Sequence, residues 1–220
     1  VAVPVVDSIG RLVGRITVDD VMDEVREQAE RDYQLASGLS QDVETDDNVF
    51  RQTTARLPWL LIGMLGGIGN SMILGNFDST FAAHPEMALY IPLIGGTGGN
   101  VGTQSSALVV QGLANSSLNA ENTFKQVLKE SVVALINATI ISMLVYIYNF
   151  IRFGATATVS YSVSISLFAV VMFASIFGTL VPMTLEKLKI DPAIATGPFI
   201  SITNDIIGML MYMGITVLLS

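Results

Sequence analysis

Five long apolar stretches constrain the fold of this 220-residue chain more than any other feature. A helix needs about 20 mostly apolar residues to cross the roughly 30 Å hydrocarbon core of a bilayer, and only helices and closed barrels satisfy their backbone hydrogen bonds there. Hydrophobic residues make up 51% of the chain and charged residues 14%, which is too apolar for a soluble domain. The sequence therefore predicts an all-α membrane protein with five transmembrane helices, at about 57–74, 87–113, 128–150, 159–185 and 194–219.

Basic residues near these spans indicate the orientation, because Lys and Arg are enriched in short cytoplasmic loops. Three flanking regions carry a pair of bases each: Arg51 and Arg56, Lys125 and Lys129, and Lys187 and Lys189. The other two loops carry only Arg152. We therefore predict a multi-pass membrane protein with a cytoplasmic N-terminus and a C-terminus, Ser220, on the outside.

The segment before the first span is acidic, with twelve acids and six bases in residues 1–56. VAVPVVD and RLVGRIT have the composition of strands, and VDDVMDEVREQAERDYQLASG has the spacing of a helix with one apolar face. This pattern predicts a short cytoplasmic β-β-α unit, followed by a polar connector over residues 40–54. Seven acids share the polar face of the helix, which fits either a solvated surface or a surface where cations gather.

Polar and glycine residues interrupt the second span in the stretch GGTGGNVGTQSS, Gly95–Ser106. The stretch matches neither the phosphate-loop nor the dinucleotide-binding pattern. Glycines spaced four apart favour close packing of membrane helices, which is one explanation. The other is a path for a solute, because polar groups at membrane depth are tolerated where they contact protein or line water.

Asp205 lies near the middle of the fifth span, where an ionised carboxylate costs at least about 3 kcal/mol without a partner or water. None of the spans offers an interior Lys or Arg, and Glu130, near the start of the third span, is expected to snorkel to the surface. At helical spacing a polar stripe runs through Asp205: Gly197, Ser201, Asp205, Gly208 and Tyr212. The stripe predicts a helix that lines a cavity, although an Asp bonded to Asn100 or Gln104 would serve structure alone.

A cation is the solute that an unpaired acid suits. One Asp per chain is a small ligand set for a divalent ion, but symmetric dimers are the commonest oligomers, and Mg²⁺ is often held through its waters. Two copies of Asp205 across a twofold axis are therefore expected to hold a partly hydrated divalent cation.

Three segments resemble one family. PVVDSIGRLVGRITVDDVMDEV resembles the second half of a CBS domain, and PLIGGTGGNVGTQSSALVVQGLA and DPAIATGPFISITNDIIGMLMY resemble the second and fifth spans of the MgtE magnesium channels. The resemblance implies a homodimer in a bacterial or archaeal inner membrane. It also implies three regions: residues 1–24 as the end of a CBS domain, 18–54 as an acidic plug helix and linker, and 55–220 as the five-helix pore.

The resemblance also assigns residues. Asp205 is similar to the selectivity acid, the carbonyl of Ser201 to its companion, and Asn100 to a pore-lining residue; acids of the plug helix, Asp32 among them, would bind regulatory Mg²⁺. Gly197, Gly208, Gly99 and Thr103 are expected to line the pore, Thr103 standing where the family often has Asn.

Passive, gated uptake of Mg²⁺, and of other divalent cations, is thus the expected function. The alternatives are a carrier coupled to H⁺ or Na⁺, or a membrane-anchored CBS sensor that conducts nothing. The chain shows no nucleophile with a base and no basic patch, so we expect neither an enzyme nor a nucleic-acid-binding protein.

Overall fold

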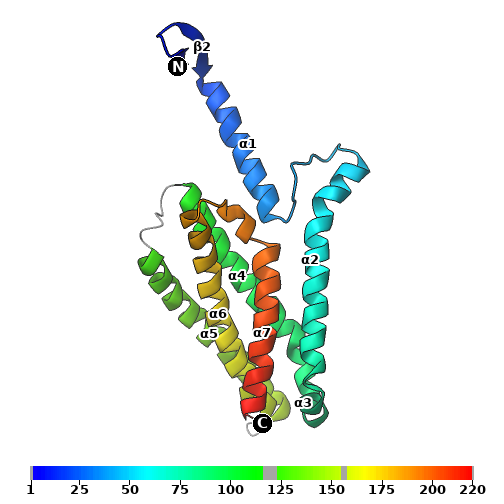
Figure 1. Cartoon of the computed structure of the whole chain (residues 1–220). Coiled ribbons are helices and arrows are strands. Elements are labelled where there is room, and N and C mark those ends of the chain that lie inside the picture. The colour runs from blue at the N-terminus through cyan, green and yellow to red at the C-terminus, as the bar shows by residue number, and fades with distance from the viewer. Residues whose placement is uncertain (1, 116–122, 155–157, 220) are drawn as a thin grey trace.

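The computed structural model describes residues 2–115, 123–154 and 158–219, so that Val1 and Ser220 lie outside the described residues. Figure 1 shows a bundle of long helices from which one helix, α1, and a small hairpin extend at one end. The two ends of the chain lie at opposite ends of the molecule (Figure 1). We call the end of the bundle from which α1 extends the α1 end.

The N-terminal unit has the predicted β-β-α order. Strands β1 (Ala2–Val6) and β2 (Leu12–Thr17) pair antiparallel, and the Asp7 carboxylate accepts hydrogen bonds from two backbone N–H groups of the turn. Helix α1 (Val18–Ala36) begins with a capping box between Thr17 and Asp20. The hydrogen bonds from Thr17 lower the pKa of Asp20. No side chain of α1 is buried, so this helix stands largely in solvent.

Five long helices follow: α2 (Val49–Gly75), α4 (Ile91–Ala114), α5 (Thr123–Phe153), α6 (Thr158–Lys187) and α7 (Pro198–Leu219). Short helices connect them: α3 (Asp78–Ala83), η1 (Pro85–Tyr90) and η3 (Pro192–Ala195). Within the described residues, α2, α5, α6 and α7 are long and apolar enough to cross a membrane. This confirms a multi-pass helical membrane protein. The fifth span stays a prediction, although the 24 residues of α4 extend about 36 Å.

Two local expectations differ from the structure. The connector is shorter than predicted, because Asn48 caps the backbone N–H of Arg51 and α2 starts at Val49. The glycine-rich stretch causes no break, because α4 is a continuous helix from Ile91 to Ala114. Its glycines lie at helix contacts: a Cβ atom on Gly178 of α6 would collide with the carbonyl oxygen of Gly102. The two backbones touch there, as small residues allow in membrane helices.

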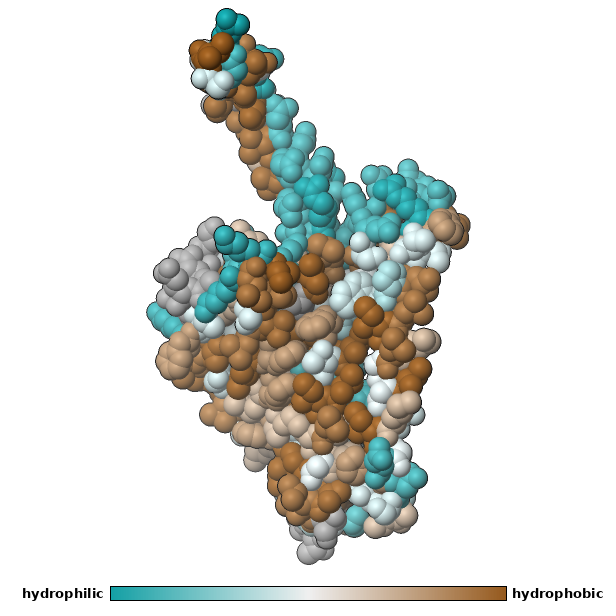
Figure 2. All heavy atoms as spheres, viewed as in Figure 1, coloured by the Kyte–Doolittle hydropathy of each residue, from teal (hydrophilic) through white to brown (hydrophobic). Residues whose placement is uncertain are grey.

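Helix α6 is the centre of the bundle. It packs against α4, α5 and α7, and its buried residues, Leu167, Val170 and Val171 among them, form the core with residues of the neighbouring helices. Helix α2 packs mainly on α7, where Gly66 lies against Ile202. Several apolar residues of α2, Leu60, Met64 and Met72 among them, are exposed, and so fit lipid or another protein surface. On the face that Figure 2 shows, apolar residues cover the bundle, and polar residues gather along one side of α1 and at the ends of the bundle.

Candidate functional site

Asp205 lies on α7, about 5 Å along the helix from its middle. Its side chain is half-buried. Within the part of the chain that the structure describes, no hydrogen bond or ion pair reaches its carboxylate. The structural alternative of an Asp bonded to Asn100 or Gln104 is therefore not what the structure shows. A carboxylate in this position needs water or a cation in the assembled protein.

The wall beside Asp205 is made of two glycines of α4. A Cβ atom on Gly95 or on Gly99 would lie 3.4 Å from Asp205 Oδ1, and one on Gly99 would also lie 2.9 Å from Ser201 Oγ. The absence of these side chains lets α4 approach the polar side of α7. Asp205, Ser201 and Gly99, three of the predicted site residues, therefore lie together.

The remaining predicted residues of α4 lie beside this cluster. Asn100 is exposed and Thr103 is half-buried. With Gln104 and Gln111, which are also exposed, Asn100 places amide groups on an outward face of the helix. Amides that face hydrocarbon alone would be costly, so this face requires water or another protein surface. The pore-lining role of Asn100 and Thr103 stays a prediction.

The polar stripe of α7 turns into the protein beyond Asp205. Gly208 is buried, with Val170 of α6 3.3 Å from the place of a Cβ atom, and Tyr212 is fully buried and donates a hydrogen bond of 2.8 Å to the Met87 carbonyl oxygen. The prediction of one continuous cavity-lining stripe is therefore wrong at Tyr212, because the C-terminal half of α7 packs this side against the rest of the bundle.

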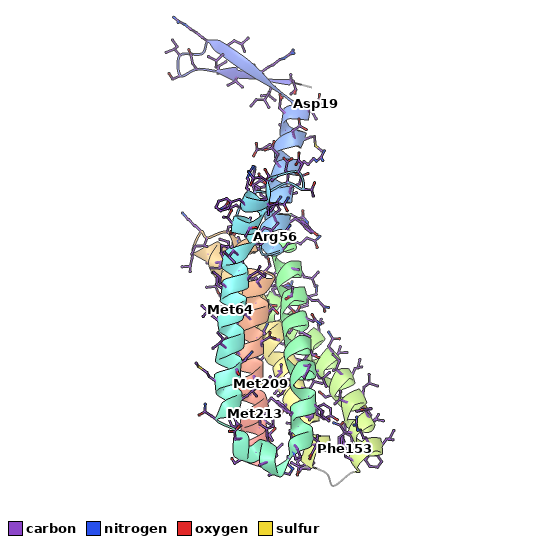
Figure 3. The ribbon with its side chains drawn as sticks, turned by 90° about the vertical axis from the view of Figure 1, so that its right-hand side faces the viewer. Asp19, Arg56, Met64, Phe153, Met209 and Met213 are labelled. Carbon is purple, nitrogen blue, oxygen red and sulfur yellow. The ribbon has the colours of Figure 1, made fainter. Side chains whose placement is uncertain are left out.

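The start of α7 contacts the end of α1. Gly197 has φ +51°, a conformation that favours glycine, and a Cβ atom there would collide with the Ala36 carbonyl oxygen. A Cβ atom on Gly38 would lie 2.6 Å from Pro198 Cγ. The last turn of α1 thus rests directly on the residues where α7 begins. Figure 3 shows α1 extending from this junction, with Asp19 at its far end.

The acids of α1 are partly offset by two arginines. Arg26 pairs with Glu30 at 2.9 Å, and Arg31 pairs with Glu24 at 3.1 Å. Asp32 accepts a hydrogen bond of 2.7 Å from Gln28. Exposed ion pairs of this kind contribute little to stability. Within the described residues, no group of three His, Cys, Asp or Glu could hold a metal ion, so the regulatory role of Asp32 stays a prediction.

Two polar residues of the bundle differ from the sequence analysis. Glu130 was expected to snorkel, and this is wrong: it is 9% exposed and accepts hydrogen bonds from Ser105 and Ser175, at 2.7 and 2.5 Å. Asn204 was overlooked. It is fully buried against Gly102, and its amide has no hydrogen-bond partner among the described residues. Its signal in the sequence is an amide next to Asp205 in an apolar span.

Comparisons with known proteins agree with this arrangement. Residues 91–215, which include α4 to most of α7, match the family model of the MgtE divalent cation transporters. Similar proteins include the magnesium transporters MgtE of Bacillus subtilis, 34% identical over 97% of this chain and 47% of the relative, of Thermus thermophilus, 34% identical over 98% and 48%, and of Enterococcus faecalis, 31% identical over 97% and 47%.

The chain spans about half the length of these relatives. The family resemblance drawn from the second and fifth spans is confirmed, since both lie within the matched residues. With a family model that covers more than half of its residues, this protein belongs to the MgtE family of divalent cation transporters.

Proposed function

We propose that two copies of this chain form a pore through which Mg²⁺ crosses the membrane passively. Asp205 of both copies holds the partly hydrated ion on the twofold axis, beside Ser201 and Gly99. The observation that carries this proposal is a half-buried carboxylate near the middle of α7, to which the described residues offer no partner. Transport of a divalent cation is what the family membership supports.

The dimer follows from the ligand count. One chain supplies Asp205 alone in α7, and within the described residues there is no group of three His, Cys, Asp or Glu that could hold a metal ion. A twofold axis beside α4 and α7 supplies the second carboxylate. In such a dimer the outward amides of α4, Asn100 and Gln104, would face water or the second copy of the chain instead of lipid. Closed twofold dimers are the commonest assemblies of this kind.

Mg²⁺ suits two carboxylates that face each other at a distance. The ion binds oxygen ligands and gives up its waters reluctantly, so it is usually held by one or two carboxylates and its own hydration shell. The curated relatives are magnesium transporters by name, which favours this ion. An inside-negative potential contributes about 4.6 kcal/mol to the entry of a divalent ion per 100 mV, so no coupling ion is needed.

The test is uptake of Mg²⁺ into proteoliposomes at a potential set with K⁺ and valinomycin. Passive conduction predicts that uptake rises with an inside-negative potential and is unchanged when the proton and sodium gradients are collapsed. A strict requirement for either gradient would identify a coupled carrier and overturn the channel. Liposomes that stay impermeable at any potential and at low Mg²⁺ would identify a sensor that conducts nothing.

We also propose that α1 gates the pore and that the N-terminal unit, α1 included, lies in the cytoplasm. The support is the contact of Gly38 with Pro198, the first residue of α7, and of Ala36 with Gly197, which precedes it. Cations that bind the acids of α1 reduce their mutual repulsion and stabilise one position of this helix. A displaced α1 would then move the start of α7.

Neutralising three of these acids tests the gate. The variant Asp23→Asn, Glu27→Gln, Asp32→Asn is expected to raise about tenfold the Mg²⁺ concentration that half-inhibits current in a planar bilayer. About 1.4 kcal/mol of lost ion binding corresponds to this factor. The control is Asp46→Asn with Glu186→Gln, which removes two exposed acids outside α1. Inhibition that is the same in both variants would contradict a gating role for α1.

A further inference from the structure

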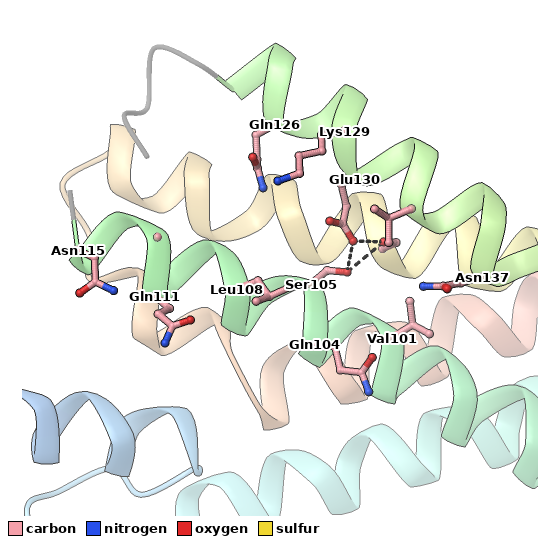
Figure 4. A pocket seen from close by; sticks show the side chains of 13 residues that line it. Val101, Gln104, Ser105, Leu108, Gln111, Asn115, Gln126, Lys129, Glu130 and Asn137 are labelled. Atoms are coloured by element: carbon pink, nitrogen blue, oxygen red, sulfur yellow. Dashed lines mark hydrogen bonds between the residues drawn. The ribbon is translucent and has the colours of Figure 1, made fainter. Parts of the chain in front are cut away.

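A polar cavity lies between α4 and α5 at their α1 end, away from Asp205 (Figure 4). Both helices pack on α6, which closes the cavity from behind through Ser175. Its volume is about 500 Å³. Asp205, Ser201 and Asn100 do not line this cavity, whereas Gln104, which we place near the proposed twofold axis, does.

Glu130 of α5 is the buried acid of the cavity. Ser105 of α4 and Ser175 of α6 both donate hydrogen bonds to its Oε1 atom, and their hydroxyl oxygens lie 3.0 Å apart. The described residues give no hydrogen bond to the other oxygen, Oε2. A carboxylate that is 91% buried, with one oxygen fixed and the other open to the cavity, is a built acceptor for a donor that enters from outside.

Lys129 also lines the cavity, beside Glu130 in the sequence. Figure 4 shows both side chains directed toward the space between the helices, and the structure records no ion pair between them. A bare cation would be repelled by the ammonium group of Lys129, and a bare anion by Glu130. The two charges together fit a zwitterion that presents a cationic donor to Glu130 and an anionic group to Lys129.

The depth of the cavity indicates where this zwitterion comes from. Glu130 lies eight residues before Ala138, the middle of α5, or about 12 Å along the helix. Half of the hydrocarbon core measures about 15 Å. With the middle of α5 at the centre of the bilayer, Glu130 would lie close to the boundary between the acyl chains and the phospholipid headgroups. Apolar side chains, Val101, Leu108 and Val133, complete the wall of the same cavity, and Leu108 and Val133 are exposed on the outer surface.

We propose that this cavity binds a phospholipid whose headgroup carries a primary ammonium, as in phosphatidylethanolamine, in the leaflet at the α1 end. The ammonium donates to Glu130 Oε2 and the phosphate lies beside Lys129. The acyl chains run along the apolar wall. A phosphatidylcholine headgroup has the same charges but no N–H donor, so it satisfies Lys129 and leaves Glu130 without a hydrogen bond.

The test is a titration of the purified protein, followed by native mass spectrometry, with four lipids of identical acyl chains: phosphatidylethanolamine, its N-methyl and N,N-dimethyl forms, and phosphatidylcholine. The first three lipids all keep an N–H donor and should bind with similar affinity. Phosphatidylcholine has none and should bind about tenfold more weakly, since a charge-assisted hydrogen bond contributes at least this factor. Glu130→Gln should abolish the preference for lipids with an N–H donor. Glu186→Gln, which changes an exposed acid near the C-terminal end of α6, should keep this preference. Lys129→Met should lower the affinity for all four lipids equally, because all four carry the phosphate that lies beside Lys129.

Equal affinity of the wild-type protein for the four lipids would overturn the proposal without any variant, so the test survives if Glu130→Gln does not fold. An unchanged preference in folded Glu130→Gln protein would also overturn it. Glycerophosphoethanolamine, the headgroup without acyl chains, is added as a competitor. Displacement of the lipid at equal concentration would assign the site to a soluble zwitterion and reject the lipid, whereas no displacement supports it.

Discussion

Replacing Asp205 with asparagine is expected to lower Mg²⁺ flux at least about a hundredfold while the protein stays folded. The amide keeps the size of the side chain and loses its charge. At an effective dielectric constant of about 20, a divalent ion about 5 Å from one carboxylate gains about 7 kcal/mol. If each of the two asparagines of the proposed dimer removes only a third of this attraction, the loss already exceeds the roughly 2.7 kcal/mol that corresponds to a hundredfold change.

Folding should not suffer from this change. The described residues give Asp205 no hydrogen bond or ion pair that the variant would break, and an amide costs less than a carboxylate at this depth. The thermal unfolding midpoint in detergent should therefore be equal to or above that of the wild type. An Asp with a structural role would instead show a lower midpoint with flux preserved.

Asp78→Asn is the matched control, because it makes the same chemical change at an exposed position of α3 with no hydrogen-bond partner among the described residues. Its flux should equal that of the wild type. Both variants are measured in proteoliposomes that contain equal amounts of protein. Undiminished flux through Asp205→Asn would reject Asp205 as the ion-binding residue, whatever the control shows.

The sequence predicted the elements well, because each depends on local patterns. Runs of strand-forming residues on both sides of a short turn predicted β1 and β2, and the spacing of apolar residues predicted α1. The long apolar runs predicted the helices of the bundle. The boundaries were harder to predict, since α2 starts at Val49 and its first turns contain polar residues, Arg51 to Thr54, before the apolar run.

The arrangement of polar residues depends on contacts that no local pattern contains. The position of Glu130, one turn inside a span, fits either an outward or an inward side chain. The choice is made by Ser105 and Ser175, which come from two other helices. Tyr212 shares the spacing of Asp205 but is buried because α7 leans on α6. Asp205 itself was predictable, since few places in a membrane protein accept an isolated acid.

Gly99 tests the geometry of the site independently of its charge. Replacing Gly99 with valine is expected to lower Mg²⁺ flux about tenfold or more, although Asp205 is unchanged. The Cβ atom would lie 2.9 Å from Ser201 Oγ and 3.4 Å from Asp205 Oδ1, and valine adds two methyl groups beyond it. The site can accommodate them only if Ser201 and Asp205 move, and the added methyl groups take the place of water that a hydrated ion requires.

Gly67→Val on α2 is the control, since it places the same β-branched residue in a membrane helix where a Cβ atom has no neighbour within 4 Å. Both variants carry the same helix-propensity change, so a difference in flux between them reports the contact with α7. Gly99→Val with Ser201→Ala removes the Oγ atom that the Cβ atom meets, and should recover the thermal unfolding midpoint more than the flux. Wild-type flux through folded Gly99→Val would show that ions pass elsewhere, because a pore that contacts Asp205 at this place has no room for the added side chain.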